Sequence, residues 1–273
     1  MRIIFSLNLI SIFVVFTTYA QKPPNIQQNS LRAPADIKID GKATEWKDKF
    51  QAYNRATDIF YTICNDDENL YLAIQASEPD VLTKITNRGI VFSINTSGMK
   101  KDENAVSITY PVFDFLYGNK PFIRFANSSM YDFQRLAMEQ NPDSVSKVAN
   151  KKLHASEKFV RINGIPGVDT LLSIYNQQGI KVAEAFDNKM AYSYELALPL
   201  KYLNMNKASK FVYHIMLPGI DVYKDLGYKF TKRADGAIVA SLPPGGVTVQ
   251  ASHLPAVTST TDFWGEYVLT KEK

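Results

Sequence analysis

Two segments of this chain alternate strictly between large apolar residues and smaller or polar ones. The apolar positions are Leu70, Leu72, Ile74 and Ala76 in the first segment, and Met190, Tyr192, Tyr194, Leu196 and Leu198 in the second. A β-strand places successive side chains on opposite faces, so each segment predicts a strand with one buried face. A shift of one residue would expose the whole apolar set, so we expect these side chains to face one core.

Further short strands are expected along most of the chain, separated by turn-forming Gly, Asn, Asp and Pro residues. They lie near residues 57–64, 90–95, 158–163, 171–175, 180–186, 211–217 and 263–269. Many short strands and few helices predict an all-β fold, an antiparallel two-sheet β-sandwich of immunoglobulin or jelly-roll type. Residues 110–153 interrupt the pattern and predict a partly helical insertion, whereas residues 218–262 are expected to form long loops.

The chain begins with a segment that has the three parts of a signal peptide. Arg2 supplies the positive charge, an apolar run follows to Phe16, and Ala20 provides a small residue for cleavage. The apolar run is shorter than the roughly 20 residues of a membrane span, which favours export over anchoring. We therefore expect a signal peptide over 1–20, an extended lead-in over 21–35, one domain over 36–273 without a transmembrane segment, and a secreted or periplasmic location.

The net charge limits the kinds of partner that are expected, and the cysteine content limits the possible disulfides. The net charge of +4 becomes +3 once Arg2 is removed, too little to predict binding to nucleic acid or to an anionic membrane. The single cysteine, Cys64, excludes an intramolecular disulfide and lies in a strand-like run, where a buried structural thiol is expected.

Catalytic motifs are missing from the sequence. Neither Gly-x-Ser-x-Gly, His-Glu-x-x-His nor a P-loop occurs, and the three histidines are far apart. No catalytic residue is assigned, and the chain is not expected to be an enzyme. His214 and Met216, on one strand, leave a haem or redox-cofactor carrier as a third-ranked hypothesis.

The acidic cluster at residues 65–69 allows two interpretations. Asp66 and Asp67 could offer oxygen ligands to calcium, but Asp and Asn are also the residues that turns prefer. The turn is the favoured interpretation, and no cofactor is then expected. Bound calcium is the alternative.

Four short segments, in this order, resemble a known family. They are Asp40-Gly41 with Glu45-Trp46, the acidic turn 65–69 before Leu70-Tyr71-Leu72, Tyr194-Glu195-Leu196-Ala197-Leu198-Pro199, and Asp262-Phe263-Trp264-Gly265. Together they are similar to the carbohydrate-binding module family 9-like domains, which are related to DOMON sandwiches. The resemblance implies a two-sheet sandwich that binds carbohydrate without catalysis. Sugar-binding members clamp a sugar between two tryptophans, but Trp46 and Trp264 match structural positions, so both are predicted to be mostly buried.

We expect a ligand site between the insertion and the loop at residues 221–233, because aromatic rings there could stack on sugars beside arginine. The candidate residues are Tyr110, Phe115, Tyr117, Arg124, Tyr223, Tyr228 and Arg233. Alternatively, the two segments pack on each other and fill a gap. The predicted function is a secreted binding module for a poly- or oligosaccharide. The second hypothesis is a cell-surface or periplasmic structural domain that holds a protein partner.

Overall fold

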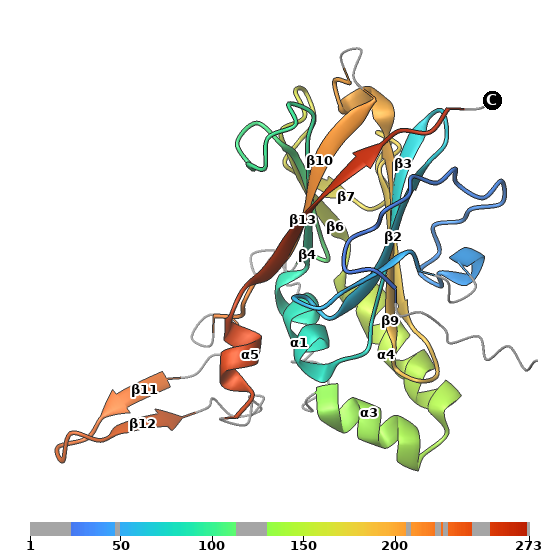
Figure 1. Ribbon diagram of the computed structural model, residues 1–273. Coiled ribbons are helices and arrows are strands. Elements are labelled where there is room, and N and C mark those ends of the chain that lie inside the picture. The colour runs from blue at the N-terminus through green and yellow to red at the C-terminus, as the bar shows by residue number, and fades with distance from the viewer. Residues whose placement is uncertain are drawn as a thin grey trace, which may run out of the picture.

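The computed structural model describes residues 23–46, 50–112, 130–205, 209–221, 225, 229–241 and 252–271. Two antiparallel sheets of five and six strands face each other across one core (Figure 1). This arrangement confirms the predicted all-β two-sheet sandwich. The predicted signal peptide lies outside the described residues, among which no helix is long and apolar enough to cross a membrane.

The strands of each sheet come from distant parts of the chain. In the five-stranded sheet the order is β1 (Ala52–Asn54), β2 (Ile59–Asn65), β3 (Asn69–Ala76), β9 (Tyr192–Pro199) and β8 (Lys181–Phe186). In the six-stranded sheet it is β13 (Thr261–Val268), β10 (Lys210–Leu217), β4 (Ile90–Asn95), β5 (Val106–Tyr110), β6 (Phe159–Asn163) and β7 (Leu171–Ser173).

The two alternating segments form neighbouring central strands. β3 pairs with β9 so that Leu72 lies opposite Leu196 and Ile74 opposite Tyr194. The side chains predicted to form the core are all buried, at 1% exposure or less. The period-two pattern therefore predicted both the strands and their buried face correctly.

The predicted insertion contains two helices, α3 (Met130–Glu139) and α4 (Pro142–Ser156). The side chain of Asn141 caps α4 by accepting a hydrogen bond from the N–H of Ser144, and proline opens the helix. The side chain of Asn150 forms hydrogen bonds to both backbone groups of Phe186. These contacts fix α4 against β8, an edge strand of the five-stranded sheet.

The remaining helices among the described residues are short except for α1. They are the 3-10 turns η1 (Thr44–Trp46) and η3 (Leu200–Tyr202), then α1 (Pro79–Arg88) and α5 (Leu254–Thr258). In Figure 1, α1, α3, α4 and α5 all lie at the lower end of the sandwich.

A hairpin stands where sequence patterns predicted only loops. β11 (Lys229–Lys232) pairs with β12 (Ile238–Ser241) and projects from the sandwich near α5 (Figure 1). Asp235 accepts a hydrogen bond from the N–H of Ala237 within the turn, next to Gly236 in the left-handed region. Each strand has only four residues, and β12 begins with three consecutive apolar ones, so the period-two signal is weak.

A hydroxyl pair joins the two sheets in the core. The hydroxyls of Tyr61 on β2 and Tyr213 on β10 lie 2.9 Å apart. The ring of Tyr213 rests against the backbone of Gly265 on β13, so a side chain there would collide with it. The glycine after Trp264 is therefore required by packing.

Residues 23–33 form an N-terminal strap along β2. The Gln27 side chain binds both backbone groups of Ile63, at 2.8 Å each. Asn65, at the end of β2, exchanges backbone hydrogen bonds with Leu31 and Ala33. Its side-chain oxygen also accepts from the N–H of Thr270, at 2.9 Å. Asn65 thus ties the strap to the segment that follows the last strand.

A second, smaller apolar cluster lies on the outer face of the five-stranded sheet. Trp46 and Cys64 are both buried there, as predicted, with 8% and 0% exposure. Trp264 is buried less completely than Trp46, and it lies on the outer face of the six-stranded sheet. It alternates with the inward-facing Phe263 and Gly265, so strand geometry places it outside the core.

Candidate functional site

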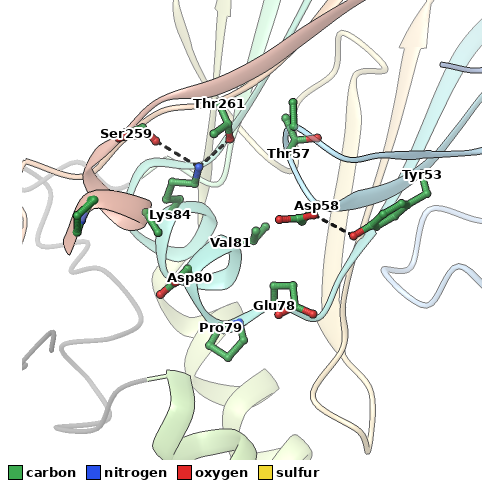
Figure 2. A pocket seen from close by; sticks show the side chains of 13 residues that line it. Tyr53, Thr57, Asp58, Glu78, Pro79, Asp80, Val81, Lys84, Ser259 and Thr261 are labelled. Carbon is green, nitrogen blue, oxygen red and sulfur yellow. Dashed lines mark hydrogen bonds between the residues drawn. The ribbon is translucent and has the colours of Figure 1, made fainter. Parts of the chain in front are cut away.

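An open pocket of about 510 Å³ lies beside α1 (Figure 2). The turn between β1 and β2, the start of α1, and the segment from α5 to β13 form its walls. We call it the β1–α1 pocket. Its lining residues are Tyr53, Ala56, Thr57, Asp58, Glu78, Pro79, Asp80, Val81, Lys84, Pro255, Ala256, Ser259 and Thr261.

The β1–β2 turn presents the carboxylate of Asp58. The side-chain oxygen of Asn54 accepts hydrogen bonds from the N–H groups of Ala56 and Thr57, which fixes the turn. Asp58 follows in the left-handed region, at a φ of 51°, and its Oδ1 accepts a hydrogen bond of 2.9 Å from the Tyr53 hydroxyl. The ring of Tyr53 lies 4.6 Å from that of Phe60, so its position is also fixed.

The start of α1 contributes two further carboxylates. Pro79 opens the helix, Glu78 precedes it and is exposed, and Asp80 lies in the first turn. Negative charge is favourable at this end of a helix because the first backbone N–H groups point towards it. Asp80 also lies 3.1 Å from Nδ1 of His253.

Lys84 brings an ammonium group into the pocket wall. Its Nζ donates hydrogen bonds to Oγ1 of Thr261 at 2.7 Å and to the carbonyl of Ser259 at 3.3 Å (Figure 2). The residue is only 3% exposed. Burial lowers the pKa of Lys84, while the negative charges of Asp58 and Asp80 act in the opposite direction.

The pocket therefore offers carboxylate oxygens as acceptors and one ammonium as a donor. Three carboxylates against one lysine give the lining a negative balance. No group of three His, Cys, Asp or Glu side chains in the described part of the chain is arranged to hold a metal ion.

Of the residues predicted for the ligand site, the structure describes Tyr110 and Arg233, and neither of them lines this pocket. Tyr110 is buried at 3% exposure, with its ring 6.1 Å from that of Tyr194. Arg233 is exposed in the β11–β12 turn, 3.7 Å from Asp235. Phe115, Tyr117, Arg124, Tyr223 and Tyr228 lie outside the described residues.

The acidic turn after β2 is organised by Asp66. Its Oδ1 accepts hydrogen bonds from the N–H groups of Glu68 and Asn69, and its Oδ2 accepts one of 2.6 Å from the Tyr71 hydroxyl. Asp67 is 2.7 Å from Arg32. Each of the two carboxylates proposed for calcium thus has a protein partner.

His214, considered above for haem, has both ring nitrogens near carboxylates. Nδ1 lies 3.0 Å from Asp102, and Nε2 lies 3.0 Å from Asp262. The imidazole also stacks on the indole of Trp264. In this arrangement neither nitrogen is open to an axial ligand bond.

The sequence contains two local signals near the pocket. Glu78-Pro79-Asp80 is an acidic helix start, and Thr57-Asp58 is a polar turn, but no periodicity links them to each other or to Thr261. Comparison of the chain with protein-family models, curated protein sequences and solved structures finds no match.

Proposed function

We propose that this protein is a secreted, non-catalytic binding module that holds a saccharide in the β1–α1 pocket. The observation that carries the proposal is the combination of carboxylates, a buried ammonium and a tyrosine around one open cavity. The sequence supports it through the predicted signal peptide and the resemblance to carbohydrate-binding sandwiches.

The chemistry of the lining suits a polyol. Sugar hydroxyls both donate and accept hydrogen bonds, and hydrogen bonds to charged groups are the stronger ones. Asp58 and Asp80 can accept from neighbouring hydroxyls, while Lys84 can donate to a hydroxyl oxygen. A volume of about 510 Å³ is within the usual range for small-molecule sites.

Isothermal titration with cellobiose, xylobiose, mannobiose and glucosamine tests the proposal. We expect at least one of them to bind, and Asp58→Asn to weaken that binding by about tenfold, the equivalent of one charge-assisted hydrogen bond. Asp80→Asn should also weaken binding. Amide NMR shifts should concentrate on residues 53–58 and 78–84.

Asp143→Asn is the matched control. Asp143, like Asp80, follows a proline that opens a helix, but it is exposed on α4 away from the pocket. Melting temperatures of all variants should be recorded to separate lost binding from lost folding. Binding that is equally weakened by Asp80→Asn and Asp143→Asn, or shifts that avoid the pocket, would refute this assignment.

A further inference from the structure

A smaller pocket, of about 320 Å³, lies on the outer face of the five-stranded sheet and shares no lining residue with the β1–α1 pocket. We call it the Lys38–Lys181 pocket. Its floor is a row across three paired strands, in which Tyr71 on β3 lies opposite Ala197 on β9, and Ala197 lies opposite Lys181 on β8. The residues that flank this row along each strand face the core, so the row itself faces outward.

The middle residue of the row creates the hollow. Ala197 has only a methyl group and stands between the larger side chains of Tyr71 and Lys181. Gly179, which has no side chain, also lines the pocket. Tyr71 and Ala197 are buried, whereas Lys181 and Gly179 are exposed, so the pocket has a covered floor and an open rim.

One wall of the pocket is a chain segment anchored to the same sheet. Ile37 and Ile39 pack on the apolar cluster of this face and line the pocket. The segment is fixed at its end, because the backbone N–H groups of Asp40 and Gly41 donate to the carboxylate of Glu195 on β9. The pocket is therefore preformed, which lowers the entropic cost of binding a ligand.

The charge of this pocket is opposite to that of the β1–α1 pocket. Lys38 and Lys181 are the charged members of the described lining, and both are exposed. Neither ammonium group forms an ion pair within the part of the chain that the structure describes. The nearby carboxylate of Asp66 already accepts hydrogen bonds from the Tyr71 hydroxyl and two backbone N–H groups. The two lysines are therefore left to pair with a ligand.

We infer that the Lys38–Lys181 pocket binds a small polyhydroxy ligand through an anionic group, which is a carboxylate, sulfate or phosphate. The anion pairs with the two ammonium groups, since lysine acts as a compact positive point charge. The amide of Asn69, which lines the pocket, suits a hydroxyl because it can both donate and accept. A volume of about 320 Å³ is at the lower end of the range for small-molecule sites, so it fits one sugar-sized unit. The inference goes beyond the proposed pocket function and uses none of its residues.

Amide NMR at low salt tests the inference. Glucuronate, glucose 6-sulfate, glucose 6-phosphate and glucose are titrated separately to millimolar concentration. We expect at least one of the three anions to shift the amides of residues 69–71, 179–181 and 197, and glucose to leave them unchanged. Raising the salt from about 20 mM to about 300 mM should weaken the anion at least about threefold, because exposed charges are screened.

Variants connect the binding to the two lysines. Lys38→Gln and Lys181→Gln should each weaken the bound anion by about fivefold, as expected for loss of one partly exposed charge-assisted hydrogen bond. Lys189→Gln is the matched control, because Lys189 is exposed in the turn at the opposite end of β8 and changes the net charge equally. Ala197→Val fills the hollow without changing the charge and should also weaken binding. Melting temperatures identify any variant that loses its fold.

Several results would overturn the inference. They are the absence of shifts with all three anions, equal binding of glucose, and equal weakening by Lys181→Gln and Lys189→Gln. Inorganic sulfate that binds as tightly as glucose 6-sulfate would also overturn it, because the hydroxyls would then contribute nothing. Asp58→Asn should leave the anion bound, so failure of the β1–α1 pocket to bind a sugar would refute the proposed function and leave this inference standing.

Discussion

The carboxylate of Glu195 accepts hydrogen bonds from the backbone N–H groups of Gly41, at 2.9 Å, and Asp40, at 3.0 Å. Glu195 lies on β9 between Tyr194 and Leu196, which face the core, so its own side chain points to the outer face. There it holds the Asp-Gly loop against the sheet. Two of the segments that carry the family resemblance, the one with Asp40-Gly41 and the one with Glu195, are therefore in direct contact.

Replacing Gly41 with alanine should destabilise the protein strongly. Gly41 has a φ of +80°, and an added Cβ would collide with the backbone of Glu184 on β8. Strain and overpacking together should lower the free energy of unfolding by about 2–4 kcal/mol. Urea denaturation followed by circular dichroism measures the change.

The control for this substitution is Gly167→Ala. Gly167 has a similar φ of +75°, but nothing lies within 4 Å of an added Cβ. This substitution should lower the free energy of unfolding by only about 1–2 kcal/mol, the cost of the backbone conformation alone. Equal losses at the two glycines would show that the close approach to Glu184 does not matter.

The free energy of unfolding should fall as the pH rises, because Glu184 is buried. Its side chain is 1% exposed, between the sheets, and Oε2 accepts a hydrogen bond from the Tyr192 hydroxyl. Burial raises the pKa of Glu184 to about 8, although the Tyr192 hydrogen bond acts in the opposite direction. A carboxyl with a pKa above its unfolded value stabilises the fold at low pH, and this contribution is lost between the two pKa values.

We expect Glu184→Gln to match wild type at pH 5 and to exceed its stability at pH 9 by about 3–5 kcal/mol. The amide copies the protonated acid, so the variant has no charge to bury. Glu195, whose pKa burial raises to about 7, should leave a smaller decline in both proteins. Parallel stability curves across this pH range would contradict the prediction.

The two tryptophans should differ in their structural importance. Trp46→Ala removes a buried ring and should cost about 3–5 kcal/mol. Trp264→Ala removes a half-buried ring and its stacking on His214, for which we expect about 1–2 kcal/mol. Chemical denaturation of both variants gives the comparison, and a larger loss at Trp264 would be inconsistent with the sheet faces described here.

Asp66 is expected to stabilise the turn without calcium. Asp66→Ala removes three hydrogen bonds to neighbouring residues and should lower the free energy of unfolding by about 1–3 kcal/mol. Asp67→Ala loses only an exposed ion pair with Arg32 and should cost no more than about 1 kcal/mol. Thermal melts with calcium and with EDTA should coincide for wild type; a rise in melting temperature with calcium would restore the metal interpretation.

The core was predictable from sequence because its strands obey a local rule. Alternation at Leu70–Ala76 and Tyr192–Leu198 reports one buried face, and the structure pairs these strands directly. The same rule places Trp264 on the outer face of its sheet, since it stands between the outward residues Asp262 and Glu266.

The β1–α1 pocket was not predictable in the same way. Asp58, Lys84 and Thr261 meet only after two sheets and two helices have packed, and each alone is an ordinary polar residue. Periodicity describes which face of an element is buried, not which ends of elements converge. The site therefore depends on tertiary contacts between residues far apart in the chain.

Asn65 forms a junction between the two ends of the domain, which affects how the domain responds to a pulling force. It links the N-terminal strap, through Leu31 and Ala33, to the segment after β13, through Thr270. A force applied at residue 271 would reach this junction first, because Thr270 is bonded to Asn65, whereas a force applied at residue 23 would first load the bonds of Pro24 to Tyr53 and of Gln27 to Ile63. Under a pull at the C-terminal end, the few hydrogen bonds around Asn65 would therefore break first, while the sandwich with its pocket stayed folded.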